Sequence, residues 1–288
     1  MEYISTRGSR VGSFQDALMK GLAQDGGLFV PSEWPQINTN DFKSDLSYED
    51  LTAKIVKPFI GSEIKDDDLQ NIIKNAYSDF SSPDPVTFKK ISHGEIIVEL
   101  FNGPTLAFKD FAMQLLIPIF DHFLNKESKQ MNLIVATSGD TGSAAIHAVN
   151  KSKYLNIFCL YPKGRVSEFQ RRQMSTVNSE RINLCEIDGT FDDCQNIVKE
   201  ILADKDFSGK HNISAVNSIN WARVMIQVVY YFFSALRLDN FESEYNFSVP
   251  TGNFGDVYAG YIAKKMGLNI NRLIVATNEN DILDRFFK

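Results

Sequence analysis

Residues 131–149 read MNLIVATSGDTGSAAIHAV, and this stretch decides the fold. The run at 131–137 is almost continuously apolar, which is typical of a strand that is buried on both faces. A short turn rich in glycine and hydroxyl groups follows at 138–142, and a helical pattern begins at Gly142. The stretch therefore predicts a strand, a tight turn and a helix.

The same order recurs on both sides of this stretch. The expected pairs are a strand at 95–101 with a helix from Phe108, then 155–162 with 167–177, 182–188 with 191–202, 213–217 with 219–238, and 246–250 with 256–266, before a last strand at 272–278. Strands that alternate with helices in this way are typical of a mostly parallel sheet with helices on both faces. The predicted fold class is α/β.

The first 90 residues have a different pattern. Helical spacing at 13–22, 48–59 and 67–77 is separated by turn-rich runs such as DGGLFVPSEWP. A chain of 288 residues has room for about two domains. We therefore expect residues 1–90 to form a small helical N-terminal domain.

Composition and charge exclude several classes of protein. The net charge of −6 provides no global basic field for a nucleic acid or an anionic membrane, and we expect neither partner. The most apolar stretch, 224–236, is too short for a transmembrane helix, and no secretory signal is apparent at the N-terminus. The three cysteines and four histidines have no metal-binding spacing, so we expect no metal, no disulfide and a cytoplasmic protein.

In parallel sheets, ligands bind at the carboxyl ends of strands, so the loops there are the first candidates for chemistry. The turn after the strand at 131–137 consists of Ser138, Gly139, Asp140, Thr141 and Gly142. Its N–H and hydroxyl groups can donate hydrogen bonds to a carboxylate or a phosphate at the start of a helix. The alternative is that Asp140 or Thr141 only caps that helix.

The loop after the strand at 246–250 contains Gly252, Asn253, Phe254, Gly255 and Asp256. Glycines permit positive φ angles that turn successive N–H groups toward one point, which makes a phosphate cradle before a helix. The alternative is a plain strand-to-helix turn.

Lys109 lies in the sequence LAFKD, between Phe108 and Phe111. Partial burial beside aromatic rings lowers the pKa of an amine and makes it a better nucleophile for a carbonyl. A lysine at a helix start is usually a solvated surface residue, but that position is electrostatically poor for a cation.

The segment NSINWAR precedes and opens the helix expected at 219–238. Arg223 combined with Asn217, Ser218 and Asn220 provides charge and hydrogen-bond donors that suit a phosphate dianion. The alternative is that Arg223 neutralises a neighbouring carboxylate.

Together, in this order, LFNGPTLAFKD, ATSGDTG, NSIN and PTGNFGD, preceded by SFQDALMKGLAQDGGLFVP, resemble the threonine synthase family. The resemblance implies the fold type II of pyridoxal-phosphate enzymes, similar to the tryptophan synthase β chain. It implies that Lys109 holds pyridoxal 5'-phosphate as an internal aldimine. In the family, the GNFGD loop (252–256) anchors the cofactor phosphate and the SGDTG turn (138–142) grips the substrate carboxylate.

The implied reaction converts O-phospho-L-homoserine and water to L-threonine and phosphate. We expect Asn217, Ser218, Asn220 and Arg223 to bind the leaving phosphate. The alternatives are a threonine-synthase-like phospholyase, or a non-catalytic remnant that binds the cofactor or phosphate.

The resemblance also predicts how the rest of the chain is divided. A large cofactor-binding domain would contain residues 91–125 and 226–288, and a small α/β domain residues 126–225. Family members continue beyond the last residue here, so we expect a C-terminally truncated chain whose large domain is incomplete. The sequence does not predict the oligomeric state.

Overall fold

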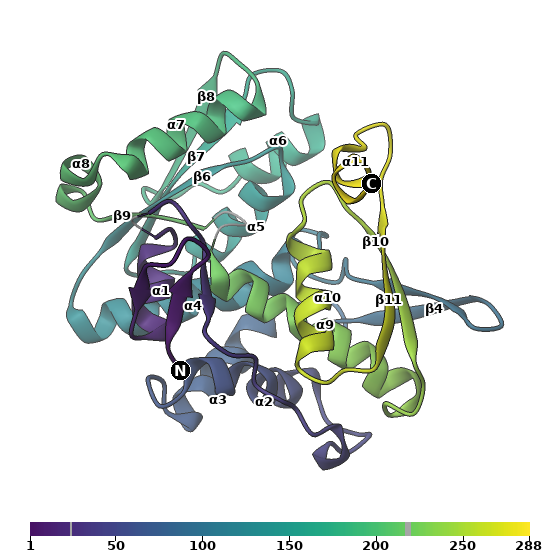
Figure 1. Ribbon diagram of the computed structural model, residues 1–288. Coiled ribbons are helices and arrows are strands. Elements are labelled where there is room, and N and C mark those ends of the chain that lie inside the picture. The colour runs from purple at the N-terminus through teal and green to yellow at the C-terminus, as the bar shows by residue number, and fades with distance from the viewer. Residues whose placement is uncertain (24, 217–219) are drawn as a thin grey trace.

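The computed structural model describes residues 1–23, 25–216 and 220–288 (Figure 1). A parallel sheet with its helices forms one side of the molecule, and a smaller parallel pair of strands lies on the other. Two long helices run between them, and the N-terminal segment packs below.

The parallel sheet has four strands in the order β8-β7-β6-β9. Its strands are β6 (Met131–Ala136), β7 (Leu155–Pro162), β8 (Ile182–Ile187) and β9 (Ile213–Ala215). The helices that connect or follow them are α5 (Asp140–Val149), α6 (Glu168–Ser175), α7 (Phe191–Ala203) and α8 (Lys205–Lys210).

Helices cover both faces of this sheet, as predicted. Side chains alternate along a strand, so neighbouring residues of β6 face opposite layers. Ile134 and Ala136 are buried with residues of α7, whereas Leu133 and Val135 belong to the main core that contains α5. This two-sided burial explains why the strand sequences are almost continuously apolar.

Two long helices form the centre of the molecule: α4 (Lys109–Glu127) and α9 (Trp221–Asp239). They pack against each other, and every residue of α9 from 221 to 236 is buried. The apolar run at 224–236 is therefore a core helix. Within the described ranges, every helix is too short or too polar to cross a membrane.

The C-terminal part is a strand–helix–strand unit. Strands β10 (Tyr245–Pro250) and β11 (Ile270–Ala276) are parallel, and α10 (Gly255–Lys265) connects them and packs on α9. A short helix, α11 (Ile282–Phe287), follows.

The N-terminal segment contains the three predicted helices. They are α1 (Phe14–Lys20), α2 (Tyr48–Ile60) and α3 (Asp66–Tyr77), with a 3-10 turn at Thr39–Asp41. Helix α2 packs on α9 and α3 packs on α4, within the same main core. A three-stranded antiparallel sheet that was not predicted lies beside them, with the order β2-β1-β3, made of β1 (Tyr3–Ser5), β2 (Arg10–Val11) and β3 (Phe29–Pro31).

The expectation that 95–101 joins the parallel sheet is wrong. Residues Glu95–Glu99 form β5, which pairs antiparallel with β4 (Thr87–Ser92) in a hairpin that projects from the molecule (Figure 1). Gly94, with a φ of 82°, lies in the turn between them. Ile96 and Ile97 are exposed, so the apolar run that suggested a buried strand lies on a two-stranded ribbon.

The other predicted elements agree with the structure to within about two residues at the ends that it describes. The domain boundaries at 90, 125 and 225 remain a prediction.

Candidate active site

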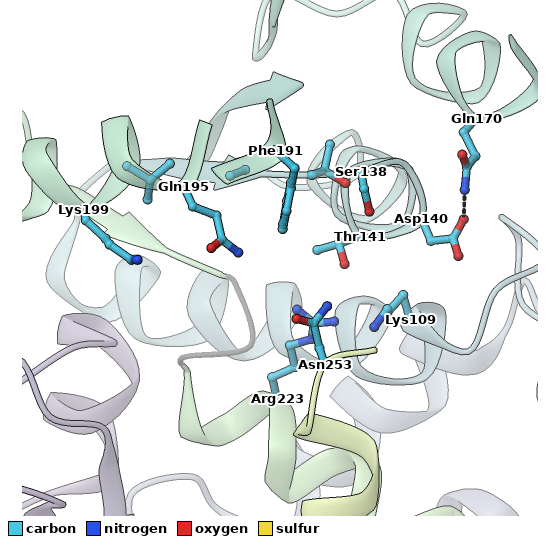
Figure 2. A pocket seen from close by; sticks show the side chains of 13 residues that line it. Lys109, Ser138, Asp140, Thr141, Gln170, Phe191, Gln195, Lys199, Arg223 and Asn253 are labelled. Carbon is cyan, nitrogen blue, oxygen red and sulfur yellow. Dashed lines mark hydrogen bonds between the residues drawn. The ribbon is translucent and has the colours of Figure 1, made fainter. Parts of the chain in front are cut away.

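A cavity of about 280 Å³ lies at the carboxyl end of β6, where the parallel sheet faces the starts of α4 and α9 (Figure 2). This is the position expected for a ligand in a parallel sheet. The residues that line it are Lys109, Ala136, Thr137, Ser138, Asp140, Thr141, Gln170, Phe191, Gln195, Val198, Lys199, Arg223 and Asn253.

Lys109 is the first residue of α4, and its amine points into the cavity (Figure 2). The side chain is partly buried, and Nζ lies 4.0 Å from the centroid of the Phe108 ring. Burial, and then the positive charge of Arg223, lower the pKa of Lys109 to about 7, although Asp256 and Asp140 act in the opposite direction. The amine is therefore substantially neutral near pH 7, as a nucleophile or a base requires.

Of its two predicted aromatic neighbours, Phe108 contacts Lys109, whereas Phe111 is fully buried in the aromatic core. The difference follows from the helix, because residues two apart do not share a face.

Asp110 fixes the loop that presents Lys109. Its buried carboxylate accepts hydrogen bonds from the Thr105 N–H at 2.8 Å, the Thr105 hydroxyl at 3.0 Å and the Gln114 amide at 3.2 Å. Burial is the largest influence and raises the pKa of Asp110 above its usual range. A Cβ on Gly103 would lie 2.4 Å from the Asp110 Cβ, so this close approach requires glycine. Sequence reasoning missed Asp110 and Thr105.

The turn at 138–142 opens α5, and the N–H groups of its two glycines donate hydrogen bonds within the protein. The N–H groups of Gly139 and Gly142 both donate to the Thr137 hydroxyl, at 3.0 and 2.8 Å. These two N–H groups are therefore engaged within the protein in this structure, and the role of Gly139 and Gly142 in substrate binding stays a prediction. Thr137, which sequence reasoning also missed, supplies the acceptor.

Ser138, Asp140 and Thr141 do line the cavity, as the predicted site requires. Asp140 accepts a hydrogen bond from the Gln170 amide of α6 at 2.5 Å (Figure 2). Its negative charge favours a cation such as an amine nearby and disfavours an anion. Asp140 is thus better suited to a proton-bearing group than to the substrate carboxylate.

Arg223 is a buried cation that faces the cavity from the first turn of α9. It is 2% exposed, and Nη1 donates a long hydrogen bond of 3.5 Å to the Val216 carbonyl. Burial lowers the pKa of Arg223 to about 10, so it remains charged at neutral pH.

No carboxylate pairs with Arg223 among residues 1–23, 25–216 and 220–288, and the remaining four residues carry none. The alternative that Arg223 neutralises a carboxylate is therefore wrong. A buried cation without a counter-ion is costly and marks an anion site.

Asn220 does not face the cavity, and its predicted role in substrate binding is wrong. It caps α9: its side-chain oxygen accepts from the Ala222 N–H at 3.1 Å, and its amide donates to the Leu18 carbonyl at 2.9 Å. Both ends of the side chain are occupied. Asn217 and Ser218 lie outside the described residues.

The loop at 252–256 joins β10 to α10, and Asn253 is the residue that it contributes to the cavity lining. Neither Gly252 nor Gly255 has a positive φ, so the expected backbone conformation is wrong. A Cβ on Gly252 would meet nothing within 4 Å, which leaves open space beside the N-terminus of α10. Phe254 is exposed, and its ring packs near Phe287 instead.

The Asp256 carboxylate accepts hydrogen bonds from two tyrosines of α9, Tyr230 at 2.5 Å and Tyr231 at 3.0 Å. Burial is the largest influence and raises the pKa of Asp256, while the tyrosines and Lys109 lower it. A carboxylate repels a phosphate, so the predicted contact of Asp256 with the cofactor phosphate could involve only the main-chain N–H of Asp256.

Sequence reasoning missed the contribution of α7. Phe191, Gln195, Val198 and Lys199 line the cavity at intervals of four, three and one residues, which is one face of a helix. The periodicity was visible in the sequence, but the sequence did not show that this face meets the candidate loops.

The residues present fit the cofactor that the resemblance implies. An amine with a lowered pKa suits attachment to its aldehyde, and the N-terminus of α10 with the open space beside Gly252 suits its phosphate. The Asn253 side chain has no hydrogen-bond partner in the described part of the chain and is available to donate.

Comparison with known families and proteins agrees with this assignment. Residues 2–77 match the model of the threonine synthase N terminus, and residues 89–288 match that of the pyridoxal-phosphate-dependent enzymes. Threonine synthases from Pseudomonas aeruginosa and Saccharomyces cerevisiae are 47% and 48% identical in sequence to this chain, over alignments that cover 99% of it. The match covers 62% and 60% of those proteins.

A solved structure of threonine synthase from Brucella melitensis with bound pyridoxal phosphate superposes with a TM-score of 0.92. It is 46% identical, and the match covers 99% of this chain and 62% of that one. The chain thus spans about three fifths of the length of these relatives. With the matching fold, motifs and cavity, the chain belongs to the pyridoxal-phosphate-dependent enzyme family and carries the N-terminal domain of the threonine synthases.

Proposed function

We propose that this chain is a threonine synthase, which converts O-phospho-L-homoserine and water to L-threonine and phosphate. The observation that carries the proposal is the pair of basic groups in one cavity, the low-pKa amine of Lys109 and the buried, unpaired Arg223. The relatives named threonine synthase support it. We also propose a cytoplasmic location.

Lys109 would hold the cofactor covalently, and Asn253 with the N-terminus of α10 would bind its phosphate. When bound, pyridoxal phosphate supplies an electron sink for the bonds at the amino-acid carbon. The protein's part is to supply the amine, the anchor and the orientation.

The Lys109 amine, once free, is the group best placed to move protons. It removes a proton from Cα and one from Cβ of the substrate, and returns one at Cγ and one at Cα. The bond between Cγ and the ester oxygen breaks, and phosphate leaves with the bonding electron pair. Water then adds its hydroxyl to Cβ, and its remaining proton goes to the released phosphate, which completes L-threonine.

Arg223 would bind the phosphate group before and after this step. It remains charged at neutral pH, and a buried guanidinium binds a phosphate more strongly than an exposed one. Since no carboxylate among the described residues competes for it, its full charge is available to the substrate.

The test is product analysis. The chain loaded with pyridoxal phosphate is incubated with O-phospho-L-homoserine, and the products are identified by NMR. Equal amounts of L-threonine and phosphate support the proposal. Phosphate with 2-oxobutyrate and ammonia would indicate a phospholyase, and no phosphate release would indicate a non-catalytic binding protein.

The matched variants are Arg223→Ala and Arg223→Lys. Loss of a charge-assisted hydrogen bond should raise KM roughly 10- to 100-fold in the alanine variant, and lysine should restore part of this loss. An unchanged KM in Arg223→Ala would show that Arg223 does not bind the phosphate.

A further inference from the structure

Helix α7 lines one side of the cavity, and none of its side chains has a role in the proposed reaction as described above. Along this face, Phe191 and Val198 are apolar, whereas Gln195 and Lys199 carry an amide and an ammonium group. The polar ends of Gln195 and Lys199 point toward the middle of the cavity, where Arg223 and Asn253 lie (Figure 2).

Neither polar group is engaged by the protein. In the described part of the chain, the side chains of Gln195 and Lys199 have no hydrogen bond or ion pair. Lys199 is exposed, as most lysines on helices are, but it also lines a cavity that contains a second donor, the Gln195 amide, and a buried arginine. Three donors, two of them cationic, thus face the same space.

Helix α7 is well fixed for this purpose. A capping box holds its start: the Thr190 hydroxyl accepts from the Asp193 N–H, and the Asp193 carboxylate accepts from the Thr190 N–H. Away from the cavity, Cys194 and Leu202 are buried against the sheet, and Val198, at the edge of the cavity, is buried with them. The positions of Gln195 and Lys199 are therefore set by the fold.

The two ends of the cavity differ in charge. Lys109, Asp140 and Gln170 lie at one end, and Gln195 and Lys199 lie at the other (Figure 2). The Asp140 carboxylate disfavours a dianion at its own end. The end formed by α7 carries a free cation and no carboxylate among the lining residues, so it favours a dianion.

We propose that Gln195 and Lys199, together with Arg223, form the subsite for the phosphoryl group of a phosphomonoester substrate and set the specificity for it. This inference rests on the proposed function and deepens it, because O-phospho-L-homoserine is such a substrate. The amino-acid end of the substrate then lies toward Lys109, and the phosphoryl group lies toward α7. An amino acid without a phosphoryl group would leave Lys199 and Arg223 unpaired and would bind weakly.

The test measures binding, which does not depend on turnover. The probe is the phosphonate in which a methylene replaces the ester oxygen of O-phospho-L-homoserine, because its phosphorus group cannot leave. L-Norvaline, which is the same molecule without the phosphonate group, is the matched ligand. Calorimetry gives the Kd of each for the chain loaded with pyridoxal phosphate.

The variants are Lys199→Ala and Gln195→Met, with Lys199→Arg to retain the charge and Lys54→Ala as a control. Lys54 is an exposed lysine on α2 outside the cavity lining. We expect Lys199→Ala to weaken the phosphonate roughly 10- to 100-fold, with Gln195→Met weakening it less, and norvaline to be unaffected. Lys199→Arg should restore most of the affinity, and Lys54→Ala should match the unmodified chain.

The outcomes separate this inference from the proposed function. If the unmodified chain prefers the phosphonate but Lys199→Ala and Gln195→Met bind it equally well, the subsite lies elsewhere and the proposed function stands. If affinity depends on Lys199 but no L-threonine forms, the subsite is supported and the proposed reaction is wrong. If the unmodified chain does not prefer the phosphonate to norvaline, both are overturned.

Discussion

At the scale of single residues, the site combines charges that a stable fold would otherwise avoid. Arg223 is buried without a counter-ion, and Lys109 lies near it with its pKa lowered to about 7. The positive charge of each group raises the free energy of the charged form of the other. Such an arrangement is expected where an anionic ligand supplies the missing charge.

The lowered pKa of Lys109 can be measured in the cofactor-free chain. The rate of acetylation of each lysine, followed by mass spectrometry across a pH series, should give a midpoint near pH 7 for Lys109. The exposed Lys54 serves as the internal reference for reagent strength. A midpoint above pH 9 would contradict the description of the site.

Asp256→Asn tests the electrostatic part of this description. The Asp256 carboxylate raises the pKa of Lys109, so removing its charge should move the acetylation midpoint of Lys109 to lower pH. Asparagine keeps the shape and can still accept from Tyr230 and Tyr231. An unchanged midpoint would show that the two groups do not interact.

Arg223→Met should stabilise the cofactor-free chain, because it replaces a buried unpaired cation with an apolar side chain of similar length. We expect a gain of about 1–3 kcal/mol in the free energy of unfolding in urea, with loss of activity. Arg237, on the same helix, is the control: it pairs with Asp84 at 3.3 Å and donates to the Ser44 carbonyl. Arg237→Met should be neutral or cost up to about 1 kcal/mol, and destabilisation by Arg223→Met would contradict the account.

Two cationic residues of the cavity could be predicted from the sequence. Lys109 was identified because a helix start is a poor position for a cation, and Arg223 because it lies beside hydrogen-bond donors that suit a phosphate; both line the cavity. Gln195 and Lys199 were missed because amide and ammonium groups on a helix are ordinary surface residues until the opposite wall is known. Asn220 was assigned wrongly, because an asparagine before a helix is equally suited to capping it.

At the scale of elements, the turn between β6 and α5 contains a glycine that is required by core packing, although the turn resembles a substrate-binding loop. Gly142 lies in the sequence that resembles a substrate loop, yet it is buried and its N–H donates to Thr137. A Cβ there would lie 2.6 Å from the Thr137 methyl carbon and 2.8 Å from the Met174 sulfur. Its requirement for glycine comes from packing.

Gly142→Ala should therefore destabilise the chain by about 1–3 kcal/mol, as overpacking of a core does. The measurement is urea unfolding of the cofactor-free chain. Gly209→Ala in α8 is the control, because a Cβ there meets nothing within 4 Å, and alanine in a helix should be neutral or gain up to about 1 kcal/mol. Equal stability of the two variants would contradict the packing argument.

Helices and buried parallel strands could be predicted because their periodicities extend over many residues. The hairpin of β4 and β5 and the sheet of β1, β2 and β3 could not, for a physical reason. Strands of two to six residues carry little pattern, and their pairing depends on turns and on distant partners. An apolar run such as EIIVE does not itself indicate whether other elements pack over it and bury it.

At the scale of the whole molecule, the cavity is assembled from segments far apart in the sequence. The parallel sheet supplies the turn at 138–142 and α7, the central helices supply Lys109 and Arg223, and the C-terminal unit supplies Asn253. A ligand that contacts all three parts should stabilise the fold as a unit.

Pyridoxal phosphate should therefore raise the Tm of the chain. At one hundred times its Kd, a ligand that binds only the folded state contributes about 2.7 kcal/mol. Lys109→Ala should reduce this stabilisation strongly, because it removes the covalent attachment. A Tm that does not respond to the cofactor would contradict the proposed site.

The most direct measurement of the central claim is to treat the chain with pyridoxal phosphate, reduce it with borohydride, and map the modified lysine by mass spectrometry. The account predicts one stoichiometric modification, at Lys109. Stoichiometric modification of another lysine, or none while the chain is folded, would contradict the claim that this cavity binds the cofactor through Lys109.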